Sequence, residues 1–467
     1  MLIYQILLGL FGLGIVVFVH ELGHFLAARW MGIGVDAFSI GWGKPILKKK
    51  IGDVEYRLGM FPLGGYCKMK GQSDHDPKSQ ALELDPNANQ QENADPQEPA
   101  QSAGNGSFYA VHPLRRIVAC AAGPVFNLLF AVLVFSVIWG IGLEVTRTDN
   151  RIILASEFDP YAVRVAEEAG LQSGDRILSI MGRRTDTFQD IRERIILNPG
   201  TTVSGEAERD GQIFQFYITP EMDRSTGAGR IGIVPWEDPV IGRVTPESPA
   251  EAASLQSGDR IIRVNGIDLP HTRAFSQIFV DRPEVLEIEF LRNGQILEDV
   301  IKPVYMETGI MDLGFSWQVM RYQTPRLSLP RALVTGATET WRTFTMSVRS
   351  LSLLFRGVDL TQAVSGPVRI TYMVGDVAVS GFNEGFLAGL RALAGFLALI
   401  SIALAIMNLL PLPVLDGGMI LLFLFETVRG KAPPAKFVTV FQTIGIVIIA
   451  GLMFFALFGD ILYFVQR

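Results

Sequence analysis

Four long apolar segments constrain the fold of this chain more than any other feature. They cover residues 3–29, 112–143, 386–411 and 438–465. Each exceeds the ~20 residues that a helix needs to cross a bilayer. We therefore predict a polytopic α-helical membrane protein with four transmembrane helices. The first segment lacks the basic start of a signal peptide and ends in Arg29, so we expect it to be retained.

The basic residues predict the orientation. Lysine and arginine gather between the first and second spans and again between the third and fourth. The positive-inside rule places both loops in the cytoplasm, so both termini and the region 145–385 face outward. The formal net charge of -6 gives no sign of a nucleic-acid partner.

The outward region contains an internal repeat. Leu171–Ile177 recurs without change as Leu255–Ile261, and Arg209–Gln212 is echoed at nearly the same offset by Arg292–Gln295. Such periodicity predicts two tandem domains. We place these β-rich domains at residues 145–225 and 228–305.

The Gly-Leu-x-Ser-Gly-Asp-x-Ile pattern of the first copy, in which Ser254 replaces the glycine in the second, resembles circularly permuted bacterial PDZ domains. PDZ domains bind a peptide as an added strand at an exposed edge. The resemblance implies a carboxylate-binding loop for peptide C-termini. We assign it to Ile231, Gly232 and Ile233 in the second copy and find no equivalent in the first. In the alternative interpretation, both copies only exclude or space other molecules.

Two further segments have recognisable patterns. Residues 326–357 carry apolar side chains at alternating spacings of three and four, which predicts an amphipathic helix. It would lie on the outer leaflet or pack against neighbouring elements. Residues 71–107 are rich in glutamine, asparagine, aspartate and proline, a composition typical of disorder.

The first span contains the pattern His-Glu-x-x-His. His20 and His24 lie four residues apart and share one helix face, with Glu21 beside them. In this pattern two imidazoles bind zinc and the carboxylate handles a proton of the reacting water. Ionisable groups at membrane depth are costly and usually functional, which favours a zinc site over two structural histidines.

A catalytic zinc also needs a third protein ligand and an open position. Our candidate is Asp416. It follows Asn408 and two prolines that break the third span, where irregular backbone is tolerated if it lines a polar cavity. The first and third spans both run inward, so His20 and Asn408 reach a similar depth. The other interpretation of Asp416 is a charged cap at the end of a span.

Three segments resemble the signature motifs of the site-2 protease family: His20–His24, Gly123–Asn127 and Asn408–Gly417. Four spans with tandem PDZ domains narrow the resemblance to the regulator of sigma-E protease group. It implies one catalytic zinc held by His20, His24 and Asp416, with Glu21 as general base and acid. Asn408 would lie beside the scissile carbonyl, and Asn127 would support the site.

The resemblance also implies a biological setting. The substrates would be single-span membrane proteins such as an anti-sigma factor, cut within the bilayer after another protease has trimmed them. The protein would reside in the bacterial inner membrane, with its termini and PDZ domains in the periplasm. The PDZ domains would exclude intact substrates by size.

A membrane-reentrant β-hairpin is implied at about residues 40–70, within a cytoplasmic-side region of residues 30–110. Gly64, Gly65 and Tyr66 could present a strand edge there to an unwound substrate.

Two other classes of function remain open from the sequence. A membrane-anchored PDZ adaptor would carry only a structural metal site. A metal transporter fits less well, because the chain shows a single acidic–histidine cluster and no repeated membrane half.

Overall fold

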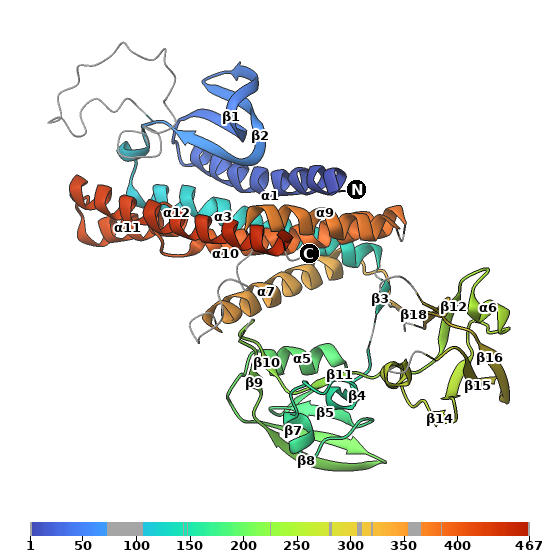
Figure 1. The fold of residues 1–467 in the computed structure, drawn as a ribbon. Coiled ribbons are helices and arrows are strands. Elements are labelled where there is room, and N and C mark those ends of the chain that lie inside the picture. Colours follow the sequence, from blue (N-terminus) through green and yellow to red (C-terminus); the bar gives the residue numbers. More distant parts are fainter. Residues whose placement is uncertain are drawn as a thin grey trace. The chain divides into compact units, whose positions relative to one another are not determined.

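The computed structural model describes residues 2–71, 106–142, 144–146, 148–224, 226–279, 283–305, 311–318, 321–353, 366–383 and 385–465. The chain forms two compact units (Figure 1). The membrane unit is built from Met1–Gly142, Arg326–Leu351 and Leu360–Arg467. The repeat unit is built from Leu143–Pro325 and Ser352–Asp359. Most of the predicted polar segment 71–107 lies outside the described residues.

Four helices of the membrane unit are long and apolar enough to cross a bilayer, which confirms the predicted fold class. They are α1 (Leu2–Trp30), α3 (Pro113–Ile141), α10 (Phe386–Leu409) and α12 (Ala435–Val465). A shorter helix, α11 (Asp416–Arg429), lies between α10 and α12 in the chain.

Helix α9 (Pro367–Asn383) was not predicted from the sequence. It packs against α1 and α10. Glycines allow close backbone approach, because a Cβ atom on Gly9 would overlap Thr371 and one on Gly375 would overlap Gln5. Helix α9 therefore fixes the N-terminal half of α1, the span that carries the histidines.

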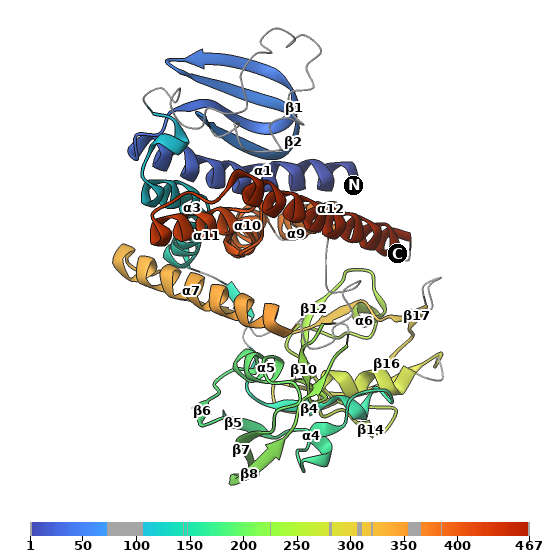
Figure 2. The ribbon, with the colours of Figure 1, turned by 90° about the vertical axis from the view of Figure 1, so that its left-hand side faces the viewer.

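Two long strands, β1 (Val35–Ile51) and β2 (Val54–Met69), form a sheet beside α1 (Figure 2). The sheet starts earlier than the predicted hairpin. The sheet is also wider than a simple two-stranded hairpin. Residues 35–40 form a central segment that pairs with residues 65–69 on one side and with residues 55–58 on the other. Residues 65–69 pair with residues 35–40 and form the last strand segment on that side of the sheet.

The repeat unit contains two matching four-stranded antiparallel sheets. The first has the order β6 (Arg183–Arg184), β5 (Arg176–Ile180), β7 (Val203–Arg209), β8 (Gln212–Ile218). The second has the order β14 (Ile267–Asp268), β13 (Arg260–Val264), β15 (Leu286–Arg292), β16 (Gln295–Ile301). Each sheet has its own apolar core.

The two halves of the repeated sequence pattern bind each other. Asp175 is 1% exposed and accepts two hydrogen bonds of 2.7 Å from Arg209. Asp259, also 1% exposed, accepts bonds of 2.7 and 2.6 Å from Arg292. A buried carboxylate requires such charge-assisted pairing, which explains why Ser-Gly-Asp and the later arginine recur together.

The assignment of the Ile231–Ile233 loop to the second copy is wrong. Strand β11 (Ile233–Pro235) pairs with β4 (Ile152–Leu154), and Ile231 belongs to the first core. The first repeat therefore extends beyond residue 225, and its last strand closes against its first.

The second repeat has an equivalent loop that the sequence analysis missed. Strand β19 (Phe315–Trp317) pairs with β12 (Ile241–Val244), and Gly314 accepts a hydrogen bond from Thr245. Gly232 accepts the corresponding bond from Ala155. Whether either loop binds a carboxylate stays a prediction.

Helix α7 (Leu329–Leu353) forms within the predicted range 326–357. Its packed face differs from the predicted apolar stripe. Gly336 lies so close to α3 that a Cβ atom would overlap Ser136, whereas Val334 and Trp341 are 68% and 65% exposed. The predicted apolar positions include Val334, Trp341 and Phe355, of which Phe355 lies outside the described residues.

Candidate active site

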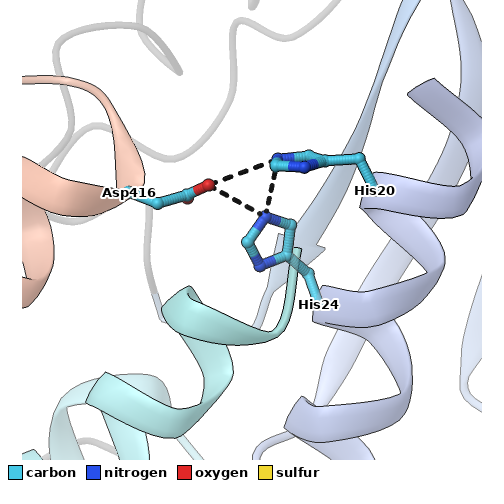
Figure 3. Close-up of side chains that lie close together, drawn as sticks. All are labelled: His20, His24 and Asp416. Carbon is cyan, nitrogen blue, oxygen red and sulfur yellow. Dashed lines mark hydrogen bonds and ion pairs between the residues drawn. The ribbon is translucent and has the colours of Figure 1, made fainter. Parts of the chain in front are cut away.

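Three ligand atoms meet in the membrane unit, from α1 and from the start of α11 (Figure 3). His20 Nε2 lies 3.2 Å from His24 Nε2 and 3.2 Å from Asp416 Oδ2. His24 Nε2 lies 3.4 Å from the same oxygen. The structure thus brings together the two histidines and the aspartate that the sequence analysis selected.

This triangle fits zinc in size and chemistry. Ligands about 2.1 Å from a tetrahedral ion lie about 3.4 Å apart, close to all three separations. Asp416 Oδ2 is buried without hydrogen-bond geometry to any partner in the described residues. Two nitrogens and one oxygen also leave a fourth position for a reacting group, as in catalytic zinc sites.

The outer nitrogens of both imidazoles are held by α3. His24 Nδ1 donates to the Ala119 carbonyl oxygen over 2.9 Å, which leaves its Nε2 lone pair for a metal. His20 Nδ1 lies 3.1 Å from the Asn127 carboxamide. The atom that faces it is Nδ2, while Asn127 Oδ1 is buried without a partner among the described residues. Turning the carboxamide by 180° exchanges the two atoms, and a protonated His20 Nδ1 then donates to Oδ1.

Glycines bring α3 against the histidine face of α1. A Cβ atom on Gly23 would lie 2.5 Å from the Ala122 carbonyl oxygen. One on Gly123 would overlap His24 Nε2 and lie 2.8 Å from His20 Cε1. The absence of a side chain at residue 123 therefore leaves room for both imidazoles.

We expect Gly123→Ala to weaken zinc binding by at least about tenfold, because the added methyl group displaces both imidazoles. Zinc per purified chain, measured by atomic emission, checks this. Gly140→Ala is a matched control in the same helix, since its Cβ atom would meet only Ala332 at 3.8 Å. Equal zinc content in both variants would contradict the argument.

Asp416 owes its position to the break between α10 and α11. Helix α10 ends at Leu409, and Val414 has a φ of 79°, rare for a β-branched residue. Asp416 then begins α11, where the helix dipole favours a carboxylate. Cβ atoms on Gly417 and Gly418 would overlap the backbone of the residues just before α11. The two glycines therefore allow the first turn of α11 to pack directly against this backbone.

A buried ion pair fixes α11 against α3. Arg116 donates to both oxygens of Glu426, over 3.1 and 2.7 Å. Such bidentate pairing is geometrically specific, so it sets the distance between α11 and α3.

A cavity of about 300 Å³ opens beside the triangle. Its lining includes the predicted residues Glu21, Gly65, Tyr66 and Asn408. Asn408 Nδ2 lies 3.5 Å from His20 Nε2, and the Cys67 backbone hydrogen-bonds to Glu21. Gly64 is not among the lining residues; it has a φ of 89° and allows the chain to turn into the edge segment.

Tyr66 is oriented by charged neighbours in the sheet. Arg57 donates to the Tyr66 hydroxyl over 3.0 Å and to Glu55 over 3.0 Å. The hydrogen bond from Arg57 and the neighbouring Lys48 lower the pKa of Glu55 to about 2. Glu55 is therefore ionised at neutral pH and keeps Arg57 in place.

Other residues that line the cavity were not predicted from the sequence: Cys67, Met69, Tyr109, Cys120, Val414, Leu415, Met419 and Gln442. Among these residues, Gln442 could have been suspected from the sequence, because it is a polar residue within the fourth apolar segment.

Comparison with known proteins agrees with this site. The profile of Peptidase family M50 matches residues 8–452. A protein of Treponema pallidum (strain Nichols), named "Putative zinc metalloprotease", is 36% identical over 462 residues, 98% of both chains. "Regulator of sigma-E protease RseP" of Escherichia coli (strain K12) is 30% identical over 96% of both chains.

A third relative, "Regulator of sigma E protease" of Haemophilus influenzae, is 30% identical over 96% of this chain and 97% of its own. The matched region contains the metal triangle, Glu21 and most of the fourth span. A match of this extent makes the chain a member of Peptidase family M50, the zinc metalloproteases that cut within membranes.

Proposed function

We propose that this protease cuts the transmembrane helix of a single-span membrane protein, such as an anti-sigma factor already trimmed by another protease. The observation that carries this proposal is the cavity beside the metal triangle, which combines groups from membrane spans with the edge of a sheet. On this proposal the enzyme serves envelope stress signalling by regulated intramembrane proteolysis.

Peptide hydrolysis in the cavity needs a base, an acid and a held carbonyl group. His20, His24 and Asp416 would hold the zinc, which when bound polarises the scissile carbonyl and acidifies water. Glu21 takes the proton from the attacking water and delivers it to the leaving amine. Asn408 lies next to His20, where its carboxamide can donate to the carbonyl oxygen.

The substrate segment must leave its helix before it can be cut, because helical backbone is hydrogen-bonded to itself. Residues 65–69 form an edge of the sheet, and Gly65, Tyr66 and Cys67 line the cavity. Pairing with this edge would replace the hydrogen bonds lost by the unwound segment. This supports the proposed roles of Gly64, Gly65 and Tyr66.

The charge pattern supports a proposed cellular arrangement. We propose that the protein lies in the bacterial inner membrane, with both termini and the repeats in the periplasm. The repeats act as PDZ domains that exclude untrimmed substrates or bind peptide C-termini. The adaptor and transporter interpretations are set aside, because the chain belongs to a peptidase family.

The test is cleavage of candidate single-span membrane proteins, trimmed on the periplasmic side, by purified full-length enzyme in detergent. Mass spectrometry should place the cut within the apolar segment. A zinc chelator should abolish cleavage, and added zinc should restore it. Cuts only outside the apolar segment, or cleavage unaffected by the chelator, would refute the proposed function.

A further inference from the structure

The fourth span contributes one polar side chain to the catalytic cavity. Most of α12 presents exposed apolar residues, as expected of a helix in lipid. Gln442 differs: its side chain is 4% exposed and lines the cavity together with Glu21, Asn408 and Asp416. No step of the mechanism above uses it.

Gln442 Oε1 is buried and has no hydrogen-bond partner among the described residues. Nearly all buried polar atoms in native proteins are paired, because an unpaired one loses its hydration without compensation. The loss is larger within a membrane, where surrounding lipid supplies no donor. An unpaired acceptor that lines an open cavity is therefore explained best by a partner that arrives with a ligand.

The position of Gln442 is set by close packing. Gly445 lies three residues further along and so shares its helix face. A Cβ atom on Gly445 would overlap Pro413 in the loop that leads to Asp416. The glycine thus lets α12 approach the loop and carries Gln442 to the wall of the cavity. The same loop positions both Asp416 and Gln442.

The chemistry of the side chain limits its role. A carboxamide does not titrate, so Gln442 is neither a general acid nor a general base. It is not among the three ligand atoms of the metal triangle. It can accept and donate hydrogen bonds with the geometry of a peptide group. An unwound peptide segment offers the matching partners, since its N–H and C=O groups have lost their helical bonds.

We propose that Gln442 binds the main chain of the unwound substrate beside the metal centre, with Oε1 accepting a backbone N–H. This inference rests on the proposed function and adds a contact from α12 to those made by the edge of β2. The substrate segment is then held by the strand edge of β2 and by α12. Gln442 is a substrate-binding residue that contacts the main chain of the substrate and not its side chains.

The test compares three full-length variants with wild type, using a fluorescent single-span peptide whose apolar segment is interrupted by glycine and asparagine. Gln442→Met keeps the length of the side chain and removes its hydrogen bonds. We expect roughly a three- to tenfold rise in KM with zinc content and kcat little changed. Gln442→Asn keeps the carboxamide and should recover part of the loss. Thr443→Val, an exposed neighbour in α12, is the control and should match wild type.

A second arm separates binding from cleavage. Affinity for the same peptide is measured in Glu21→Gln with and without Gln442→Met, and the double variant should bind the peptide several-fold more weakly. Equal KM and equal affinity would overturn the inference while leaving the proposed function intact. Loss of zinc or of folding in both Gln442 variants would also overturn it, because it would show a structural role. If wild type cleaves no single-span substrate, the proposed function fails and the binding arm alone decides on Gln442.

Discussion

Glu21→Gln is expected to slow peptide cleavage by about a hundred- to ten-thousandfold, the usual contribution of a general acid–base group. Glutamine keeps the size of the side chain and its place beside the Cys67 backbone but takes up no proton from water. Zinc should remain bound, because Glu21 is not one of the three ligand atoms. Cleavage rate and zinc content are measured on the same purified sample.

Glu298→Gln makes the same chemical change on an exposed strand of the second repeat and should retain full activity. If Glu21→Gln cleaved at the wild-type rate, proton transfer would have to come from another residue. If it lost its zinc, the effect on cleavage would no longer report on proton transfer.

Asp416→Ala is expected to weaken zinc binding by at least about a hundredfold. It removes a metal ligand itself, which costs more than removing a residue that only hydrogen-bonds to a ligand. The two histidines alone would leave the site with one protein ligand fewer than catalytic zinc requires. Zinc per chain should fall towards zero after dialysis against a weak chelator, and cleavage should fall with it.

Asp376→Ala is the matched control. Asp376 is another carboxylate of the membrane unit, but it lies on α9 and bonds to Gln5. It should lose no zinc. Retention of zinc by Asp416→Ala would mean that the histidines bind the metal with a different third ligand, which would contradict the assigned triangle.

The metal site could be predicted because its geometry is local. His20 and His24 lie four residues apart in a helix, which places them on one face wherever the helix packs. Asp416 required more, but Pro411 and Pro413 mark the end of a span at any position in a bundle. The four spans followed from length and apolar composition alone.

The remaining features depend on contacts between distant parts of the chain. Helix α9 is shorter than a span and carries Asp376, so its packing against α1 was not visible in the composition. Strand β11 pairs with a strand some eighty residues earlier, and periodicity does not reveal such pairing. The rotation of α12 that turns Gln442 inward depends on Gly445 meeting Pro413.

The sheet edge at Gly65 and Tyr66, which lines the cavity, has a consequence for substrate choice. The edge binds through its main-chain N–H and C=O groups, which can pair with the main chain of a substrate of any sequence. An enzyme that binds substrate this way discriminates weakly between side chains. It discriminates instead by the free energy of unwinding, which glycine, proline and asparagine lower in a helix and leucine raises. Recognition would then depend on how readily a span melts, so unrelated sequences of equal helical stability should be cut at similar rates.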